Sequence, residues 1–260
     1  MHYMNLDMAQ SMLLPELTFT ANDLLVFIDD TGNELFAGDQ GYYGLGGSVV
    51  LGAGYGRLKE QWKVVRSYIN GSPEAPLHAS DMSIRKPCNF AALSKFFLDR
   101  SFARIAVATL KSTVVPKDMH PAVPVMGALQ EDIATVASLI PCTAVLIIVE
   151  SSQRADPMLR QRFRELKPAG AELPIPVQYW LMPKRSAEPG LEVADFIISA
   201  AGSQIQRHMR GEDGFAPDFH DVFCQLPSHG CLFSLISEVE GNHPNQQMRM
   251  QRLRLTGNTP

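Results

Sequence analysis

The sequence predicts an α/β fold with a mixed five-stranded sheet, a helical insertion between the second and third strands, and a C-terminal extension. Two observations support this prediction. Runs of branched and aromatic apolar residues, such as 24–28 and 144–149, are typical of strands buried on both faces. Between such runs lie longer segments whose apolar residues recur every three or four positions, as in amphipathic helices.

Five segments are predicted as strands. Two of them, Leu24–Asp30 and Gly41–Leu51, are close enough in sequence to form an antiparallel hairpin. The other three are Ile105–Val115, Ala144–Val149 and Ile175–Leu181.

The helical period predicts helices over the following ranges: Arg57–Asn70, Phe90–Phe102, Pro124–Ile140, Pro157–Lys167 and Pro189–Arg210. In the first of these, Lys59, Lys63 and Arg66 are expected on the polar side. The last two strands each follow a helix, which suits parallel crossovers onto strand one. With strands numbered along the chain, the expected sheet order is 3-2-1-4-5.

This order divides the chain into three parts. Residues 1–23 are an N-terminal arm, and residues 24–210 are the main domain, with the insertion at about 52–102. Residues 211–260 are a C-terminal extension with a short helix near Phe219–Leu226 and a strand at Leu232–Ile236.

Composition excludes several classes of protein. The net charge of −4 excludes a uniformly basic surface, so any contact with nucleic acid must come from local patches. The longest apolar run, 144–149, is far shorter than the roughly 20 residues that cross a bilayer. Residues 1–23 contain no Lys or Arg and do not resemble a signal peptide, and the four cysteines form no CxxC pair. We therefore expect a cytoplasmic protein with reduced thiols and no membrane contact.

Acidic residues follow two of the predicted strands. Asp29 ends the first strand, and Glu150 comes directly after the fourth. If these strands are parallel neighbours about 4.8 Å apart, both carboxylates lie at one edge of the sheet. In the last helix, Asp195 interrupts an apolar stretch, where a carboxylate is costly unless it is paired or binds a metal.

Three converging carboxylates repel one another, and a divalent cation removes that penalty. Oxygen ligands of this kind suit Mg²⁺ or Mn²⁺, which can promote hydrolysis of a phosphodiester. We therefore expect Asp29, Glu150 and Asp195 to be metal ligands and catalytic residues, with His78 and Asp81 assisting. Nucleic acid, DNA or RNA, is the expected partner, and four basic residues are candidates for holding its phosphates: Arg85, Lys86, Lys184 and Arg185.

Several of these segments resemble domain-of-unknown-function family 3800. The resemblance lies in Ile28–Gly32, a glycine-rich strand, His78 with Asp81, and Gly190–Asp195, and it covers roughly residues 24–209. Members of that family are similar to the ribonuclease H-like superfamily, so the resemblance implies the 3-2-1-4-5 sheet and a metal-dependent nuclease. The superfamily's acids at the end of strand four and on the final helix fall on residues 150 and 195.

Three positions depart from the usual motifs of the family. Asp-Glu-Ser-Gly is replaced by Asp-Asp-Thr-Gly, and Glu192 stands where Gln is usual. We therefore expect Asp30, Thr31 and Glu192 to be neighbours of the metal ligands rather than ligands.

Two alternatives remain open at this point. The same fold could serve as a non-catalytic binding or assembly module whose acids are idle. A zinc-dependent interaction module is also conceivable from four C-terminal residues, although their spacing fits no common zinc motif: His220, Cys224, His229 and Cys231.

Overall fold

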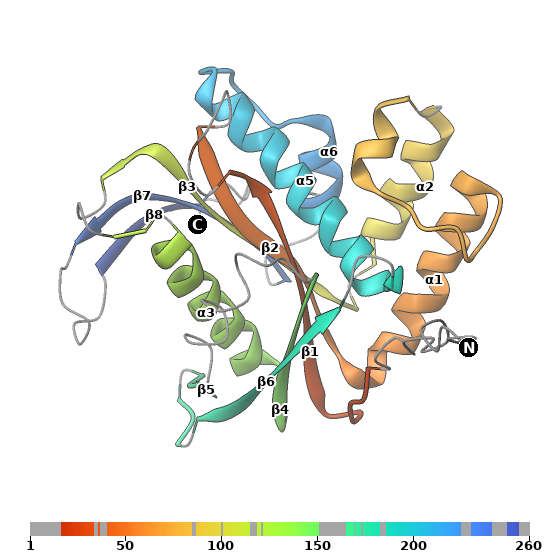
Figure 1. The fold of residues 1–260 in the computed structure, drawn as a ribbon, viewed down its shortest axis with the longest axis horizontal. Coiled ribbons are helices and arrows are strands. Elements are labelled where there is room, and N and C mark those ends of the chain that lie inside the picture. The colour runs from red at the N-terminus through yellow and green to blue at the C-terminus, as the bar shows by residue number, and fades with distance from the viewer. Residues whose placement is uncertain are drawn as a thin grey trace, which may run out of the picture.

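The protein is an α/β structure built on one mixed sheet (Figure 1). The computed structural model describes residues 17–33, 36, 41–84, 87–99, 101–114, 119–120, 122–150, 165–168, 170–172, 174–182, 186–224, 230–240 and 249–254. The strands are β1 (Asp23–Gly32), β2 (Tyr42–Leu51), β3 (Ala103–Val114), β4 (Ala144–Glu150), β5 (Glu165–Leu166), β6 (Ile175–Met182), β7 (Cys231–Glu240) and β8 (Arg249–Arg254). The α-helices are α1 (Gly52–Asn70), α2 (Pro87–Phe97), α3 (Ala122–Leu139), α5 (Pro189–Met209) and α6 (Pro217–Phe219), with a 3₁₀ turn, η1, at Ala79–Ile84 and a π turn, η3, at His220–Cys224.

The five strands expected from the sequence are neighbours in the sheet, in the order β3-β2-β1-β4-β6. β1 pairs antiparallel with β2 and parallel with β4, and β4 pairs parallel with β6. The C-terminal ends of β1, β4 and β6 therefore point to one edge, which is where open α/β sheets bind ligands.

The expectation of a five-stranded sheet is wrong, because the sheet has eight strands. The strand expected at Leu232–Ile236 is confirmed and lies within β7. β7 pairs parallel with β3 and β8 pairs antiparallel with β7, so the C-terminal extension continues the main sheet. These strands satisfy backbone groups of β3 that an edge strand would leave open. At the opposite edge, Glu165–Leu166 form β5, where the sequence predicted the end of a helix; the preceding part of that prediction, 157–164, lies outside the described residues.

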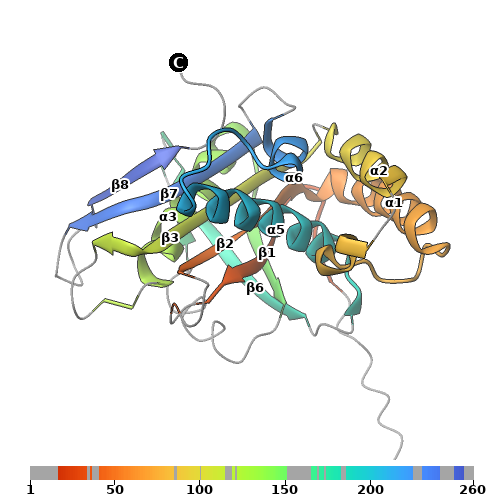
Figure 2. The same ribbon diagram turned by 90° about the horizontal axis from the view of Figure 1, so that it is seen from above.

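Helices cover both faces of the sheet. Alternate residues of β1 point to opposite sides, so Leu25 and Phe27 join a core with α1, α2, α5 and α6. Leu24, Val26 and Ile28 join a second core with α3. Seen from above, α1, α2, α5 and α6 lie on one side of the strands (Figure 2). Because side chains alternate along a strand, residue 29 lies on the same side as residues 25 and 27.

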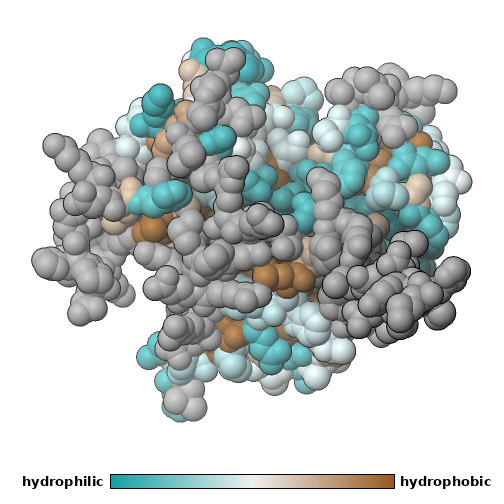
Figure 3. Space-filling model, in the orientation of Figure 1, coloured by the Kyte–Doolittle hydropathy of each residue, from teal (hydrophilic) through white to brown (hydrophobic). Residues whose placement is uncertain are grey.

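Hydrophilic residues cover much of the exposed side of α1 (Figure 3). In the described part of the chain, each helix is too short or too polar to cross a membrane.

Glycines let α5 lie close to the sheet. A Cβ atom at Gly190 would stand 2.5 Å from the ring of Phe27, and one at Gly47 would stand 1.9 Å from the carbonyl oxygen of Phe27. A Cβ atom added at Gly47 would also stand 2.9 Å from the Cβ atom of Ala194 in α5. These contacts bring the first turns of α5 down onto β1 and β2.

Gly190→Ala should therefore lower the free energy of unfolding by about 1–3 kcal/mol, because the added methyl group overpacks the contact with Phe27. The Phe27 ring cannot easily move aside, since it stacks on Tyr55 with ring centroids 5.0 Å apart. Gly56→Ala in α1 is the matched control: its Cβ meets nothing within 4 Å, and Ala favours a helix by up to about 1 kcal/mol. Urea unfolding measures both variants; equal stabilisation of the two would contradict the close contact.

Candidate functional site

Two carboxylates lie at the ends of adjacent strands, on the face of the sheet that α5 covers. The last aligned pair between β1 and β4 is Ile28 with Val149, so Asp29 and Glu150 are the next residues on the two strands. Asp29 follows Phe27 on the α5 side, and Glu150 follows Ile148, which belongs to the same core. The predicted convergence of these two residues follows from the strand register.

The third carboxylate comes from α5. Asp195 is partly buried, and its Oδ2 accepts a hydrogen bond of 3.0 Å from the backbone N–H of Ala79. The Nδ1 of His78 lies 3.6 Å from the same oxygen, so a protonated imidazole would attract it. The loop before η1 thus fixes the position of Asp195.

One cavity of about 340 Å³ unites these groups. It is lined by six residues that the sequence analysis selected: Asp29, Asp30, His78, Glu150, Glu192 and Asp195. Ser80, Ser186, Ala187, Glu188 and Leu191 complete its wall. In the described part of the chain, neither Lys nor Arg lines this cavity, so its electrostatic character is acidic.

The acidity of Asp29 reflects this crowding. Burial, followed by the negative charge of Asp195, raises the pKa of Asp29 to about 7, and the charges of Asp30 and Glu150 act in the same direction. The backbone N–H of Asp30 donates a 2.9 Å hydrogen bond to Asp29 Oδ1, which opposes the shift. At neutral pH this carboxyl group is therefore close to half ionised.

Glu192 has a structural partner. Its side chain is 4% exposed and forms an ion pair with the equally buried Arg66, with 2.8 Å between Oε1 and Nη2. Its Oε2 accepts hydrogen bonds from Trp62 Nε1 at 2.7 Å and from Arg66 Nε at 2.9 Å. The expected position of Arg66 on the polar side of its helix is wrong, because the guanidinium turns inward to this carboxylate.

Glu188 is a cavity residue that the sequence analysis missed. Burial, followed by the charge of Glu192, raises its pKa to about 7. Its Oε1 accepts a hydrogen bond from the hydroxyl of Tyr55. An acid directly before the Pro-Gly start of the last helix was the available signal, but the partner on α1 is 133 residues away in sequence.

Some expected site residues lie elsewhere. Asp81 is not among the residues that line the cavity; its backbone N–H donates to the carbonyl of His78 and closes a turn. Thr31 faces α5, where a Cβ at Gly202 would stand 2.8 Å from its Oγ1. The four candidate phosphate-binding residues lie outside the described residues: Arg85, Lys86, Lys184 and Arg185.

The donor set of the cavity fits a hard divalent cation, because it consists of carboxylate oxygens in a place where they repel one another. In the described ranges, however, no group of three His, Cys, Asp or Glu side chains is arranged so that it could hold one ion. Of the four residues in the zinc alternative, Cys231 accepts a 3.3 Å hydrogen bond at its Sγ from Arg104. His229 lies outside the described ranges.

Comparison of the chain with protein-family models, with curated proteins and with solved structures finds no match. The residues of the cavity are therefore the basis for a proposed function. The resemblance to domain-of-unknown-function family 3800 and to the ribonuclease H-like superfamily stays a prediction.

Proposed function

We propose that the protein is a metal-dependent nuclease that hydrolyses phosphodiester bonds of nucleic acid in this acidic cavity. The observation that supports the proposal best is that Asp29, Glu150 and Asp195 line one cavity. Burial, followed by the charge of Asp195, raises the pKa of Asp29 there. A site that keeps mutually repelling carboxylates together is more stable once a cation neutralises them.

In this proposal, Asp29, Glu150 and Asp195 would hold Mg²⁺ or Mn²⁺. Such an ion, when bound, polarises a phosphoryl oxygen and increases the acidity of water. His78 and the N–H of Ala79 keep the carboxylate of Asp195 directed at the cavity. In this role, His78 and Ala79 orient the carboxylate of Asp195 and transfer no proton themselves.

The phosphate backbone of the substrate needs positive charge, and the described residues of the cavity wall include no Lys or Arg. Ser186 lines the cavity, and Arg185 and Lys184 precede it directly in sequence. Arg85 and Lys86 follow η1, whose Ser80 is also in the wall. We propose that these two basic pairs contact phosphates of the substrate.

The proposal is tested by incubating the full chain with DNA and RNA oligonucleotides, single- and double-stranded, in Mn²⁺ and in excess chelator. Cleavage in Mn²⁺ that the chelator abolishes is the expected result. If none of the oligonucleotides is cleaved with Mn²⁺ or Mg²⁺, the nuclease proposal is wrong.

A second candidate is a non-catalytic binding or assembly module with the same fold. It is favoured by the arrangement of the acids, because the described residues contain no three-ligand metal group and Glu192 is committed to Arg66. Calorimetric titration with Mn²⁺ separates the two candidates. An idle site should give no heat that depends on Asp195, whereas the nuclease should bind Mn²⁺ and lose affinity in Asp195→Asn.

Binding of Mn²⁺ should weaken as the pH falls below 7. A ligand must be ionised to bind the cation, and the Asp29 carboxyl, whose pKa is raised to about 7, gains a proton below that pH. Between pH 7.5 and pH 5.5 we expect the dissociation constant to rise by roughly 20-fold. Calorimetry at both values measures it, and a constant affinity would show that Asp29 is not a ligand. Glu188→Gln, which removes the other group with a pKa of about 7, should keep the same pH dependence.

A further inference from the structure

The cavity contains the carboxyl group of Glu188, which is not one of the proposed metal ligands. Glu188 lies directly before α5, and its carbonyl oxygen accepts the N–H groups of Leu191 at 3.0 Å and Glu192 at 3.1 Å. Its backbone is therefore fixed by the first turn of the helix. Its side chain lines the same cavity as Asp29 and Asp195.

A second contact fixes the side chain. The hydroxyl of Tyr55 donates a hydrogen bond to Glu188 Oε1. Tyr55 is 2% exposed, and its ring stacks on Phe27, so it has little freedom to move. The carboxyl group is thus held on one side by a rigid hydroxyl and is open to the cavity on the other.

The surroundings let a large fraction of this group keep its proton near neutral pH. Burial and the charge of Glu192 raise the pKa of Glu188 to about 7. The charged and titratable groups around it are Tyr55, Lys59 and Arg66 on α1, Glu192 on α5, and the cavity groups Asp29, Asp30, His78, Glu150 and Asp195. Of these, Arg66 is paired with Glu192, and Lys59 lies 5.6 Å from the centre of the Tyr55 ring.

We propose that Glu188 is a catalytic residue of the phosphodiester hydrolysis, acting as the general acid that protonates the leaving oxygen; this inference rests on the proposed function. In the step, the oxygen of water forms a bond to phosphorus, and the bond from phosphorus to the leaving oxygen breaks with its electron pair. The leaving oxygen takes the proton of Glu188. Water releases a proton to solvent, and the carboxylate regains one from solvent, so the overall reaction consumes only water.

The test compares two substrates that differ in their need for a proton. A single-stranded DNA oligonucleotide has an alkoxide leaving group that must be protonated, whereas bis(4-nitrophenyl) phosphate releases a stable nitrophenolate. Glu188→Gln keeps the size of the side chain and an acceptor for Tyr55 but cannot donate a carboxyl proton. With Mn²⁺, kcat for the oligonucleotide should fall by about 100-fold, and kcat for the nitrophenyl ester by less than about threefold.

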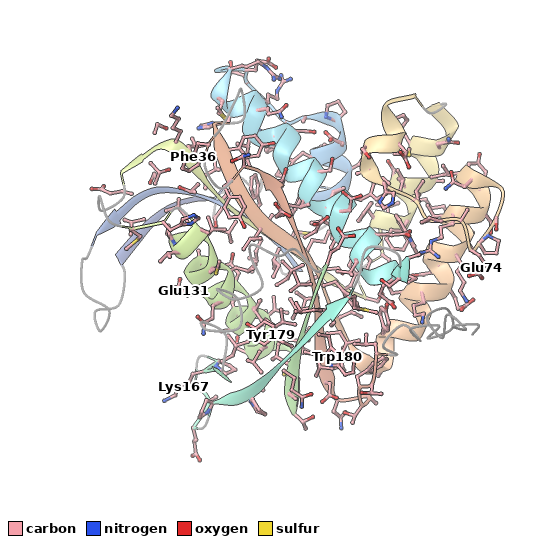
Figure 4. The ribbon with its side chains drawn as sticks, in the orientation of Figure 1. Phe36, Glu74, Glu131, Lys167, Tyr179 and Trp180 are labelled. Carbon is pink, nitrogen blue, oxygen red and sulfur yellow. The ribbon has the colours of Figure 1, made fainter. Side chains whose placement is uncertain are left out.

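Two further measurements separate catalysis from structure. The wild-type kcat for the oligonucleotide should decline above pH 7, where Glu188 loses its proton, and this decline should disappear in Glu188→Gln. Mn²⁺ affinity should be unchanged in the variant. Glu74→Gln, an exposed residue on the loop after α1, is the matched control and should leave all three measurements unchanged (Figure 4).

Equal losses on both substrates, no loss on either, or weakened Mn²⁺ binding in Glu188→Gln would each overturn the general-acid role. These outcomes leave the nuclease proposal intact, because the wild type would still cleave. A wild type that cleaves neither substrate with Mn²⁺ overturns the nuclease proposal and this inference together.

Discussion

Asp29→Asn should reduce Mn²⁺-dependent cleavage by at least about 1,000-fold while leaving the protein folded. Loss of residues that merely orient metal ligands costs 10- to 100-fold in affinity or activity, and Asp29 is proposed as a ligand itself. The amide keeps the size of the side chain but has one oxygen fewer and no charge. Initial rates on a single oligonucleotide, at saturating Mn²⁺ for each protein, measure the effect.

The same variant should be at least as stable as the wild type at pH 8. The folded-state pKa of Asp29 is about 7, above its ordinary value, so burying this carboxylate in ionised form destabilises the fold as the pH rises through 7. An amide removes that cost. Asp213→Asn, an exposed residue beyond α5, is the control and should change neither rate nor stability. Full activity of Asp29→Asn would remove this residue from catalysis.

Much of the fold could be predicted from the sequence because the central strands have a local signature. The runs at 24–28 and 144–149 are apolar at every position, and both are buried on both faces in the structure. The position of Asp29 beside Glu150 needs only these strands and a parallel crossover between them. Asp195 was also detectable, because a lone acid in an apolar helical stretch needs a partner or a ligand.

Other features depended on contacts between distant parts of the chain. Arg66 lies in the same helix as Lys59 and Lys63, and the helical period placed all three on the polar side. The burial of Arg66 depends on its partner Glu192, which is 126 residues away in sequence. Glu188 acquires its raised pKa only when folding buries it beside the charge of Glu192. A strand at 232–236 could be predicted, but its place in the main sheet could not, because pairing with the edge of β3 leaves no local pattern in residues 211–260.

Glu192→Ala should lower the free energy of unfolding by about 3–5 kcal/mol. Breaking a buried ion pair leaves the remaining charge uncompensated, and here that charge is the guanidinium of Arg66, which is 3% exposed. Arg66 also donates to the carbonyl oxygens of Pro73 at 3.2 Å and Ala187 at 2.6 Å, so it cannot turn to solvent without losing these contacts. Urea unfolding at neutral pH measures the loss.

Two comparisons show whether the loss comes from the buried charge. Glu60→Ala removes the exposed partner of Lys63, a surface pair at 2.9 Å, and should cost at most about 0.5 kcal/mol. The double variant Arg66→Met with Glu192→Leu should be more stable than Glu192→Ala, because it buries no unpaired charge. A loss below about 1 kcal/mol in Glu192→Ala would instead mean that Arg66 reaches solvent or another acid of the cavity. The cavity wall at residues 187–192 would then be held by packing against Phe27 and Trp62 rather than by charge.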